Sequence, residues 1–255
     1  MNVFRSYLDC ISVANMRESD RLTIERLCPG RTLMYRAALG VYRAADWDGV
    51  TAIAVGGGNN GGDGCALACI LARNGHRSRI VKLSEKLTED SFFYANLAAN
   101  LSVTMEPYAP GAFAACDTIV DCLLGTGFQG SLREPWLSAV KEINGSGARV
   151  ISVDINSGMN GDTGEAETAV RSDLTVTVGF VKRGLVTENA GRYMKRLAVA
   201  DIGIVLAWEE DKICTSGETE LSAGWCACPP WLRREPIDVR TADERELARD
   251  RAQET

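Results

Sequence analysis

Short apolar runs alternate along the chain with longer segments in which apolar residues recur every three or four positions. The short runs predict strands buried on both faces, as in a parallel sheet, and the longer segments predict helices with one buried face. Their alternation predicts an α/β fold built around a mostly parallel sheet. The predicted strands are 51–55, 77–83, 116–124, 149–154, 173–178 and 196–200, and the predicted helices are 22–27, 31–45, 65–73, 88–101 and 133–143.

A glycine-rich turn, residues 56–64, joins the first predicted strand to the helix that follows it. A strand, a glycine turn and a helix N-terminus present backbone N–H groups to an anion, usually a phosphate. The first six residues of the turn also have the G-x-G-x-x-G spacing of a dinucleotide site. Asn59, Asn60 and Asp63 add side-chain hydrogen-bonding groups that a phosphate cradle does not need. Asp63 either starts the helix or acts on a substrate, and we expect the helix dipole to hold it ionised.

Polar residues also lie at the carboxyl ends of later strands, where parallel sheets bind ligands. Asp121 stands inside an apolar strand, which is costly unless the carboxylate is paired, hydrogen-bonded by neighbouring loops or bound to a cation. Asp154 ends its strand, so it either contacts a ligand or caps the next turn. Lys182 is a candidate phosphate contact. We expect four strand ends to meet at one edge of the sheet: 59–63, 121–130, 154–157 and 182–184.

Composition limits the class of protein. The 255 residues, 45% hydrophobic and 24% charged, suffice for one sizeable α/β domain or for a domain with an appendage. The net charge of −6 argues against a nucleic-acid surface. No apolar run is long enough for a membrane span and no signal peptide is evident, so we expect a cytoplasmic protein.

The reactive residue types are informative mainly by exclusion. Nine cysteines without a Cys-x-x-Cys pair predict buried free thiols. The single histidine, His76, is expected in a surface loop, which argues against a Ser-His-Asp triad or a His-rich metal site. The second predicted strand ends in Lys82-Leu83-Ser84-Glu85, without the clear ribose-binding acid of a dehydrogenase. An ordinary NAD-dependent oxidoreductase is therefore disfavoured.

Seven motifs, in order and spacing, carry a resemblance to a known family: 58–64, 121–130, 133–135, 153–158, 182–185, 191–193 and 201–204. Together they resemble the YjeF N-terminal domain, the NAD(P)HX epimerase family, over about residues 12–205. The resemblance implies a Rossmann-like three-layer α/β/α sandwich, often dimeric. It also implies interconversion of the R and S forms of hydrated NADH or NADPH, which carry a hydroxyl at C6 of the nicotinamide ring. A separate NAD(P)HX dehydratase then restores the S form.

The resemblance further implies which residues serve this reaction. Asn60, Asp121 and Ser157 would bind a potassium ion, and their oxygen atoms are of the kind that hard cations take. Asp63 and Asp154 are candidates for protonating the leaving hydroxyl and stabilising the resulting cation. Taking Asp154 to be the more buried, we expect it to hold a proton more readily. The expected substrate contacts are Asn59, Asn60, Gly61, Gly62, Asp63, Gly125, Thr126, Gly127, Phe128, Gln129, Gly130, Ser131 and Asp154.

The resemblance places an epimerase domain at residues 1–205, followed by a linker and charged tail at 206–255. Bifunctional members of the family continue into a dehydratase, which leaves open whether the tail is a remnant of such a fusion. Gly57 and Asn156 stand where the family usually has proline, and this softens two turns without removing a functional group.

The main alternative is a non-catalytic nucleotide-binding scaffold with the same fold. The joint presence of five polar residues expected in the site argues against that loss of catalysis: Asn60, Asp63, Asp121, Asp154 and Ser157.

Overall fold

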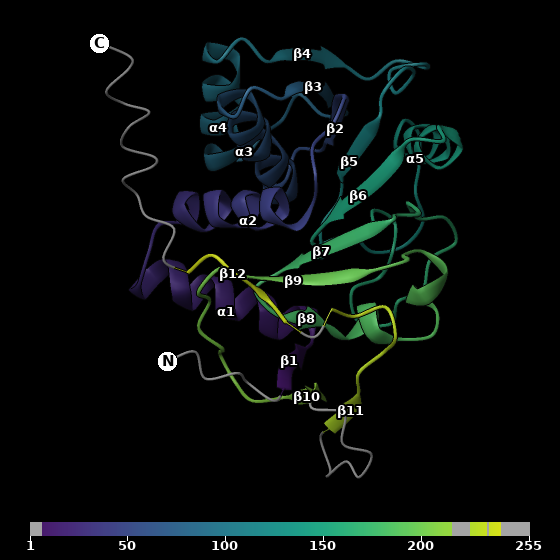
Figure 1. The fold of residues 1–255 in the computed structure, drawn as a ribbon. Coiled ribbons are helices and arrows are strands. Elements are labelled where there is room, and N and C mark those ends of the chain that lie inside the picture. Colours follow the sequence, from purple (N-terminus) through teal and green to yellow (C-terminus); the bar gives the residue numbers. More distant parts are fainter. Residues whose placement is uncertain (1–6, 216–224, 234, 241–255) are drawn as a thin grey trace.

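The computed structural model describes residues 7–215, 225–233 and 235–240 (Figure 1). Within these residues, eight strands form one sheet in the order β12-β9-β7-β6-β5-β2-β3-β4, and each neighbouring pair is parallel. The predicted parallel sheet is therefore confirmed. The strands are β2 (Val50–Val55), β3 (Arg77–Lys82), β4 (Thr104–Pro107), β5 (Thr118–Cys122), β6 (Arg149–Val153), β7 (Leu174–Val178), β9 (Leu197–Asp201) and β12 (Ile237–Asp238).

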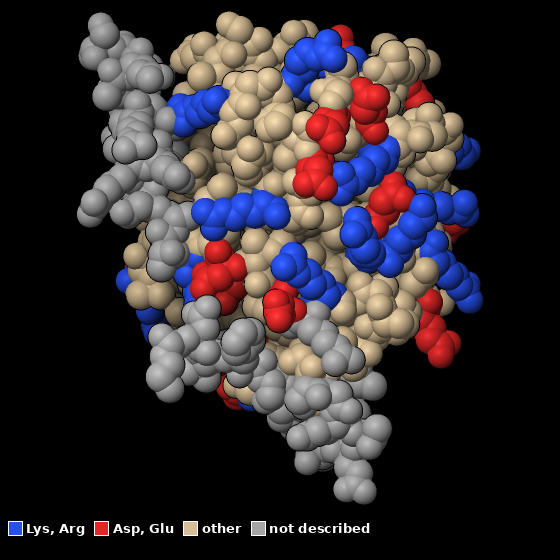
Figure 2. Space-filling model, viewed as in Figure 1, with Lys and Arg blue, Asp and Glu red and all other residues tan. Residues whose placement is uncertain are grey.

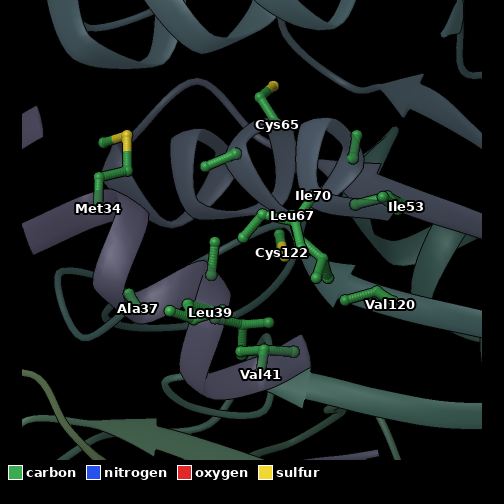
Figure 3. Close-up of a cluster of buried hydrophobic side chains, with 14 of the residues drawn as sticks. Met34, Ala37, Leu39, Val41, Ile53, Cys65, Leu67, Ile70, Val120 and Cys122 are labelled. Carbon is green, nitrogen blue, oxygen red and sulfur yellow. The ribbon is translucent and has the colours of Figure 1, made fainter. Parts of the chain in front are cut away.

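Helices cover both faces of this sheet, which confirms the three-layer α/β/α arrangement. One face carries α2 (Gly30–Ala44), α3 (Asn59–Arg73) and α4 (Glu89–Asn100), and α5 (Trp136–Gly145) packs on the other. Figure 3 shows the first interface, where Leu39 of α2 and Leu67 of α3 lie over Val120 of β5. Burial of such side chains is the main force that holds helix to sheet.

The strand order reverses between β2 and β5. From β2 the chain runs outward through β3 to β4, and it then returns to build β5, β6, β7 and β9 on the other side. Ligands of open parallel sheets bind at the carboxyl ends of the strands next to such a reversal. The turn after β2 and the loop after β5 therefore meet at the predicted edge.

A smaller sheet was not predicted. In the described part of the chain it contains four strands in the order β11-β10-β1-β8: β1 (Tyr7–Ile11), β8 (Val181–Lys182), β10 (Asp211–Cys214) and β11 (Trp225–Ala227). β1 lies between β8, to which it is parallel, and β10, to which it is antiparallel. Two short 3-10 helices, η1 (Arg183–Val186) and η2 (Ala190–Arg192), follow β8. The two ends of the described chain thus join to support the segment that carries Lys182.

Residues beyond 205 are part of this structure. Glu210 accepts hydrogen bonds from the backbone N–H and the hydroxyl of Ser12, at 2.7 and 2.8 Å, and pairs with Arg183 at 3.1 Å. Ser12 is the N-cap of α1 (Val13–Arg26). The predicted boundary at 205 therefore does not separate two units, because β10 is a strand of the small sheet and β12 is a strand of the large sheet. The predicted tail at 241–255 lies outside the described residues.

Several predicted boundaries were wrong for local reasons. α1 begins at Val13 rather than at 22, because the Ser12 hydroxyl accepts from Asn15 N and caps it. α3 begins at Asn59 rather than at 65, so residues 59–64 of the glycine-rich segment are already helical. The helix expected from 133 begins at Trp136.

The cysteines and the single histidine were expected to be buried and exposed, respectively. Cys65, Cys69 and Cys122 are buried free thiols, as expected, whereas Cys28, Cys116 and Cys228 are only partly buried. His76 is only partly buried, and its ring lies 3.4 Å from the Tyr42 hydroxyl.

Basic and acidic side chains lie beside one another on the face shown in Figure 2. None of the helices within residues 7–215, 225–233 and 235–240 combines the length and apolar character that a membrane crossing requires.

Candidate active site

A cavity of about 930 Å³ opens at the carboxyl edge of the sheet, where the strand order reverses. It lies between the start of α3, the loop after β5, the end of β6 and the helices α1 and α2. Most predicted substrate contacts line it: Asn59, Asn60, Asp63, Gly125, Thr126, Gly127, Phe128, Gln129 and Asp154. Gly61 and Gly62 are buried in α3, while Gly130 and Ser131 are exposed and lie outside the lining.

The first turn of α3 forms one wall. Its N-cap is Gly58, and no side chain caps the helix, which leaves first-turn N–H groups available to an anion. Glycine is required at position 61 by a close approach of the backbone. A Cβ there would lie 2.1 Å from the carbonyl oxygen of Gly56. The glycines thus allow the strand, turn and helix to fold tightly against one another.

We expect Gly61→Ala to disturb this wall. The added methyl group must displace the Gly56 carbonyl, and overpacking of this kind costs about 1–3 kcal/mol. Thermal unfolding measures the loss of stability. The control must be a glycine with an ordinary φ, which excludes Gly75 with its φ of 77°. Gly145→Ala, where nothing lies within 4 Å of the added Cβ, is the matched control and should leave the stability nearly unchanged.

Asp154 and Lys182 form an ion pair at the base of the cavity. The Lys182 side chain is 1% exposed, and its ammonium also donates to Thr177 Oγ1 at 3.1 Å and to the Val178 carbonyl at 2.7 Å. Its three protons therefore have three protein acceptors, which argues against the predicted phosphate contact. Asp154 has a φ of 68°, an unusual conformation for a residue other than glycine.

Asp63 faces this pair from α3. Burial raises the pKa of Asp63 well above its ordinary range, and the negative charges of Asp154 and Asp20 raise it further, against the opposing effect of Lys182. The expectation that the helix dipole keeps Asp63 ionised was wrong, because withdrawal from water and two neighbouring carboxylates outweigh the dipole. Asp154 is instead the partner of the Lys182 ammonium.

Asp20 is the site residue that sequence reasoning missed. It lines the cavity from α1, and burial raises its pKa to about 6; the Lys182 charge lowers the pKa and the Asp154 charge raises it. A signal was present in the sequence. Asp20 lies four residues after Met16 and four before Ile24, so a carboxyl group interrupts an apolar row on one helix face.

Asp121, Ser157 and Asn60 lie together beside the cavity. The fully buried Asp121 carboxylate accepts four hydrogen bonds, from Ser157 N, Ser157 Oγ, Ser152 Oγ and Leu123 N. Burial raises the pKa of Asp121, and these hydrogen bonds oppose the rise. Asn60 donates to the Leu124 carbonyl at 2.9 Å, but its buried Oδ1 has no hydrogen-bond partner among the described residues.

The sequence left open whether Asp121 is paired, hydrogen-bonded by neighbouring loops or bound to a cation. Hydrogen bonds from the neighbouring loops account for its burial without an ion. The amide oxygen of Asn60, in contrast, has no hydrogen-bond partner among the described residues. Buried acceptors are rarely left unsatisfied, so this oxygen is available to a ligand. A carboxylate, a hydroxyl and a free amide oxygen form a donor set that fits a hard cation.

Comparisons with known proteins agree with this geometry. Residues 30–184 match the family model described as YjeF-related protein N-terminus. A Limosilactobacillus fermentum protein named NAD(P)H-hydrate epimerase is 34% identical over 202 residues, covering 75% of this chain and 95% of that protein. A Coxiella burnetii protein named bifunctional NAD(P)H-hydrate repair enzyme Nnr is 34% identical over 196 residues, but the chain spans only 40% of its length. The crystal structure of yeast ynu0 shares the fold, with a TM-score of 0.67, 21% identity, and coverage of 78% of this chain and 90% of that one. The motifs, the sheet order and these similarities lead to one conclusion: the chain belongs to the YjeF N-terminal family.

Proposed function

We propose that this chain is an NAD(P)H-hydrate epimerase, an isomerase that interconverts the R and S forms of hydrated NADH or NADPH. The observation that carries the proposal is the cavity that brings together Asp63, whose pKa burial raises, and the Asp154–Lys182 ion pair. Relatives named as epimerases match over nearly their whole length, which supports the same activity here. No observation favours the scaffold alternative.

Asp63 is the group that can donate a proton. Carbon C6 of the substrate carries a hydroxyl and is bonded to the ring nitrogen, so it can lose water when the hydroxyl is protonated. The C–O electrons leave with the water, and the nitrogen lone pair forms a C=N bond. A carboxylic acid whose pKa is raised by burial is suited to this donation at neutral pH.

Asp154 provides negative charge for the cation that forms. Its ion pair with Lys182 holds the carboxylate in position, and the ammonium is itself fixed by Thr177 and Val178. A preorganised charge in a partly buried site stabilises a developing charge more than water does. Water returning to the other face of the planar cation then gives the opposite configuration.

The substrate's phosphates would lie against the α3 N-terminus. The backbone of residues 57–60 and the loop 125–129 line the cavity there, and an uncapped helix start favours an anion. This placement leaves Asp20, Asp63 and Asp154 to the ring rather than to the phosphates. The fourth carboxyl group of the lining, Asp90, pairs with Arg31 at 3.2 Å.

A potassium ion would be held by Asn60, Asp121 and Ser157. The unpartnered Asn60 Oδ1 supports this assignment, and the ion would be held between that oxygen and the Asp121 carboxylate, beside the loop after β5. When bound, the ion supplies fixed positive charge that orders this loop.

We expect potassium chloride to raise the Tm above its value in equal sodium chloride, because a ligand of the folded state stabilises it. Asn60→Ala should abolish that difference, whereas Asn59→Ala, at an exposed neighbouring position, should retain it. Equal Tm values for the wild type in the two salts would contradict the ion site.

The proposal extends to two partners. We propose a homodimer, and light scattering should report a mass of about twice 27.6 kDa. A functional link to a dehydratase is supported by relatives that are named bifunctional NAD(P)H-hydrate repair enzymes.

The activity is tested by supplying purified R-hydrate together with a dehydratase that accepts only the S form. The proposal predicts that formation of NADH then depends on the amount of this protein. A rate equal to that of spontaneous epimerisation, at any protein concentration, would overturn it.

A further inference from the structure

Asp20 is a further carboxyl group in the lining of the cavity, and the steps described above give it no role. It lies in the middle of α1 and is only partly accessible to solvent. The Ser12 cap and its hydrogen bonds to Glu210 fix the start of that helix. The carboxyl group of Asp20 is therefore carried by a helix whose start is fixed, rather than by a loop.

The charged groups around Asp20 come from several elements. They are Lys182 on β8, Asp154 after β6 and Asp63 on α3, together with Arg17 on its own helix and Asp90 on α4, which pairs with Arg31. The Asp154–Lys182 pair lines the same cavity as Asp20 and Asp63, and its charges shift the pKa of both carboxyl groups. Asp20 and Asp63 line the cavity from two different helices, α1 and α3, which lie on either side of α2 in Figure 1.

Inversion at C6 through a planar cation requires chemistry on two faces. The hydroxyl leaves from one face, and the water that inverts the centre must arrive at the other. One carboxyl group cannot contact both faces of the ring without moving around it. We propose that Asp20 is the second proton-transfer group of the site, acting on the face of the ring opposite to Asp63. This inference rests on the proposed epimerase function.

The step balances with two carboxyl groups. Asp63 gives its proton to the hydroxyl, the C–O bond breaks, and the nitrogen lone pair forms the C=N bond. A water oxygen then forms a new C–O bond on the Asp20 face, the C=N electrons return to nitrogen, and Asp20 takes the proton of the water. The reverse reaction starts with the proton on Asp20. Proton exchange with solvent resets the site, and no oxidant or reductant is needed.

The titration of Asp20 suits this exchange. Burial raises its pKa to about 6, which allows it to accept a proton and release it again near neutral pH. The active enzyme carries one proton shared between the two groups. Activity should therefore fall at low pH, when Asp20 is already protonated, and at high pH, when Asp63 has lost its proton.

The test compares Asp20→Asn with Glu18→Gln. Glu18 lies on the same helix outside the cavity lining and pairs with Arg21 at 2.7 Å, so E18Q removes a carboxylate from α1 without touching the site. We expect D20N to lower kcat about 100-fold in both directions and to remove the acid limb of the pH profile, with little change in KM. E18Q should retain the wild-type rate and profile.

The outcomes separate this inference from the proposed function. An active wild type whose rate shows no limb near pH 6, or a D20N variant with wild-type rate and profile, would overturn the role of Asp20 alone. The wild-type profile keeps the test valid if D20N fails to fold. An inactive wild type would instead overturn the epimerase function.

Discussion

Replacing Asp63 with Asn lowers kcat for epimerisation by about 10²- to 10⁴-fold, the range associated with loss of a positioned acid. The amide has nearly the same shape but cannot give a proton to the leaving hydroxyl. KM should change little, because the helix start and the loop 125–129 still bind the remainder of the substrate. Steady-state kinetics of purified D63N measures both quantities.

The same variant should be more stable than the wild type at neutral pH. Burial raises the Asp63 pKa, so the folded state binds this proton more tightly than the unfolded state. The stability that the proton provides is complete below the unfolded pKa and is lost as the pH rises towards the raised value. D63N carries no such titration, and its Tm should exceed that of the wild type at pH 8 by more than at pH 4.

Asp48→Asn is the control for this prediction, because Asp48 is exposed and outside the cavity. It should leave both kcat and the pH dependence of Tm unchanged. A D63N enzyme within about threefold of the wild-type rate would contradict the assigned proton donor, since one positioned acid contributes at least about 10²-fold.

Replacing Lys182 with Met destabilises the fold by about 3–5 kcal/mol, the cost of removing one partner from a buried ion pair. The Asp154 side chain is only 17% exposed, so its carboxylate loses its counter-charge where water can replace little of it. Activity should fall as well, because Asp154 is no longer held in place. Chemical denaturation and steady-state kinetics measure the two effects.

A double-mutant cycle with Asp154→Asn isolates the pair. The double variant should recover part of the stability lost in K182M, because neither charge then remains buried alone. Lys195→Met is the matched control: Lys195 pairs with Asp173 at 2.6 Å but is 78% exposed, so its loss should cost only about 0–1 kcal/mol. Equal losses in K182M and K195M would refute a structural role for the buried pair.

The parts of the fold that depend on local pattern could be predicted. The apolar runs that became β2, β5, β6, β7 and β9 are buried on both sides, so their composition alone indicated a parallel sheet. The carboxylates at 121 and 154 were predicted at one edge because parallel strands end together. The order of the strands, and hence the reversal beside β2 and β5, depends on long-range pairing that no local pattern encodes.

The electrostatics of the site could not be predicted in the same way. The pKa of Asp63 depends on its burial and on Asp154, Asp20 and Lys182, which come from three other parts of the fold. The helix-dipole argument used only the sequence neighbours of Asp63 and therefore gave the wrong sign. Asp20 was missed for the same reason, since its role depends on where α1 is placed by Ser12 and Glu210.

The small sheet was missed because its strands are short and distant in sequence. β1 and β10 lie about two hundred residues apart, at the two ends of the described chain. Their pairing fixes β8, whose Lys182 was recognised as a cation but assigned to phosphate. Only the buried contacts with Asp154, Thr177 and Val178 reveal its place in the site.

The most direct test of the account follows the C6 oxygen during inversion. R-hydrate is incubated with the enzyme in water enriched in ¹⁸O. The R and S forms are then separated, and the ¹⁸O content of each is measured by mass spectrometry. Loss of water from one face and its return to the other predicts that every inverted molecule carries one oxygen from the solvent. Inverted product that retains its original oxygen, or no enzyme-dependent inversion at all, would contradict the account.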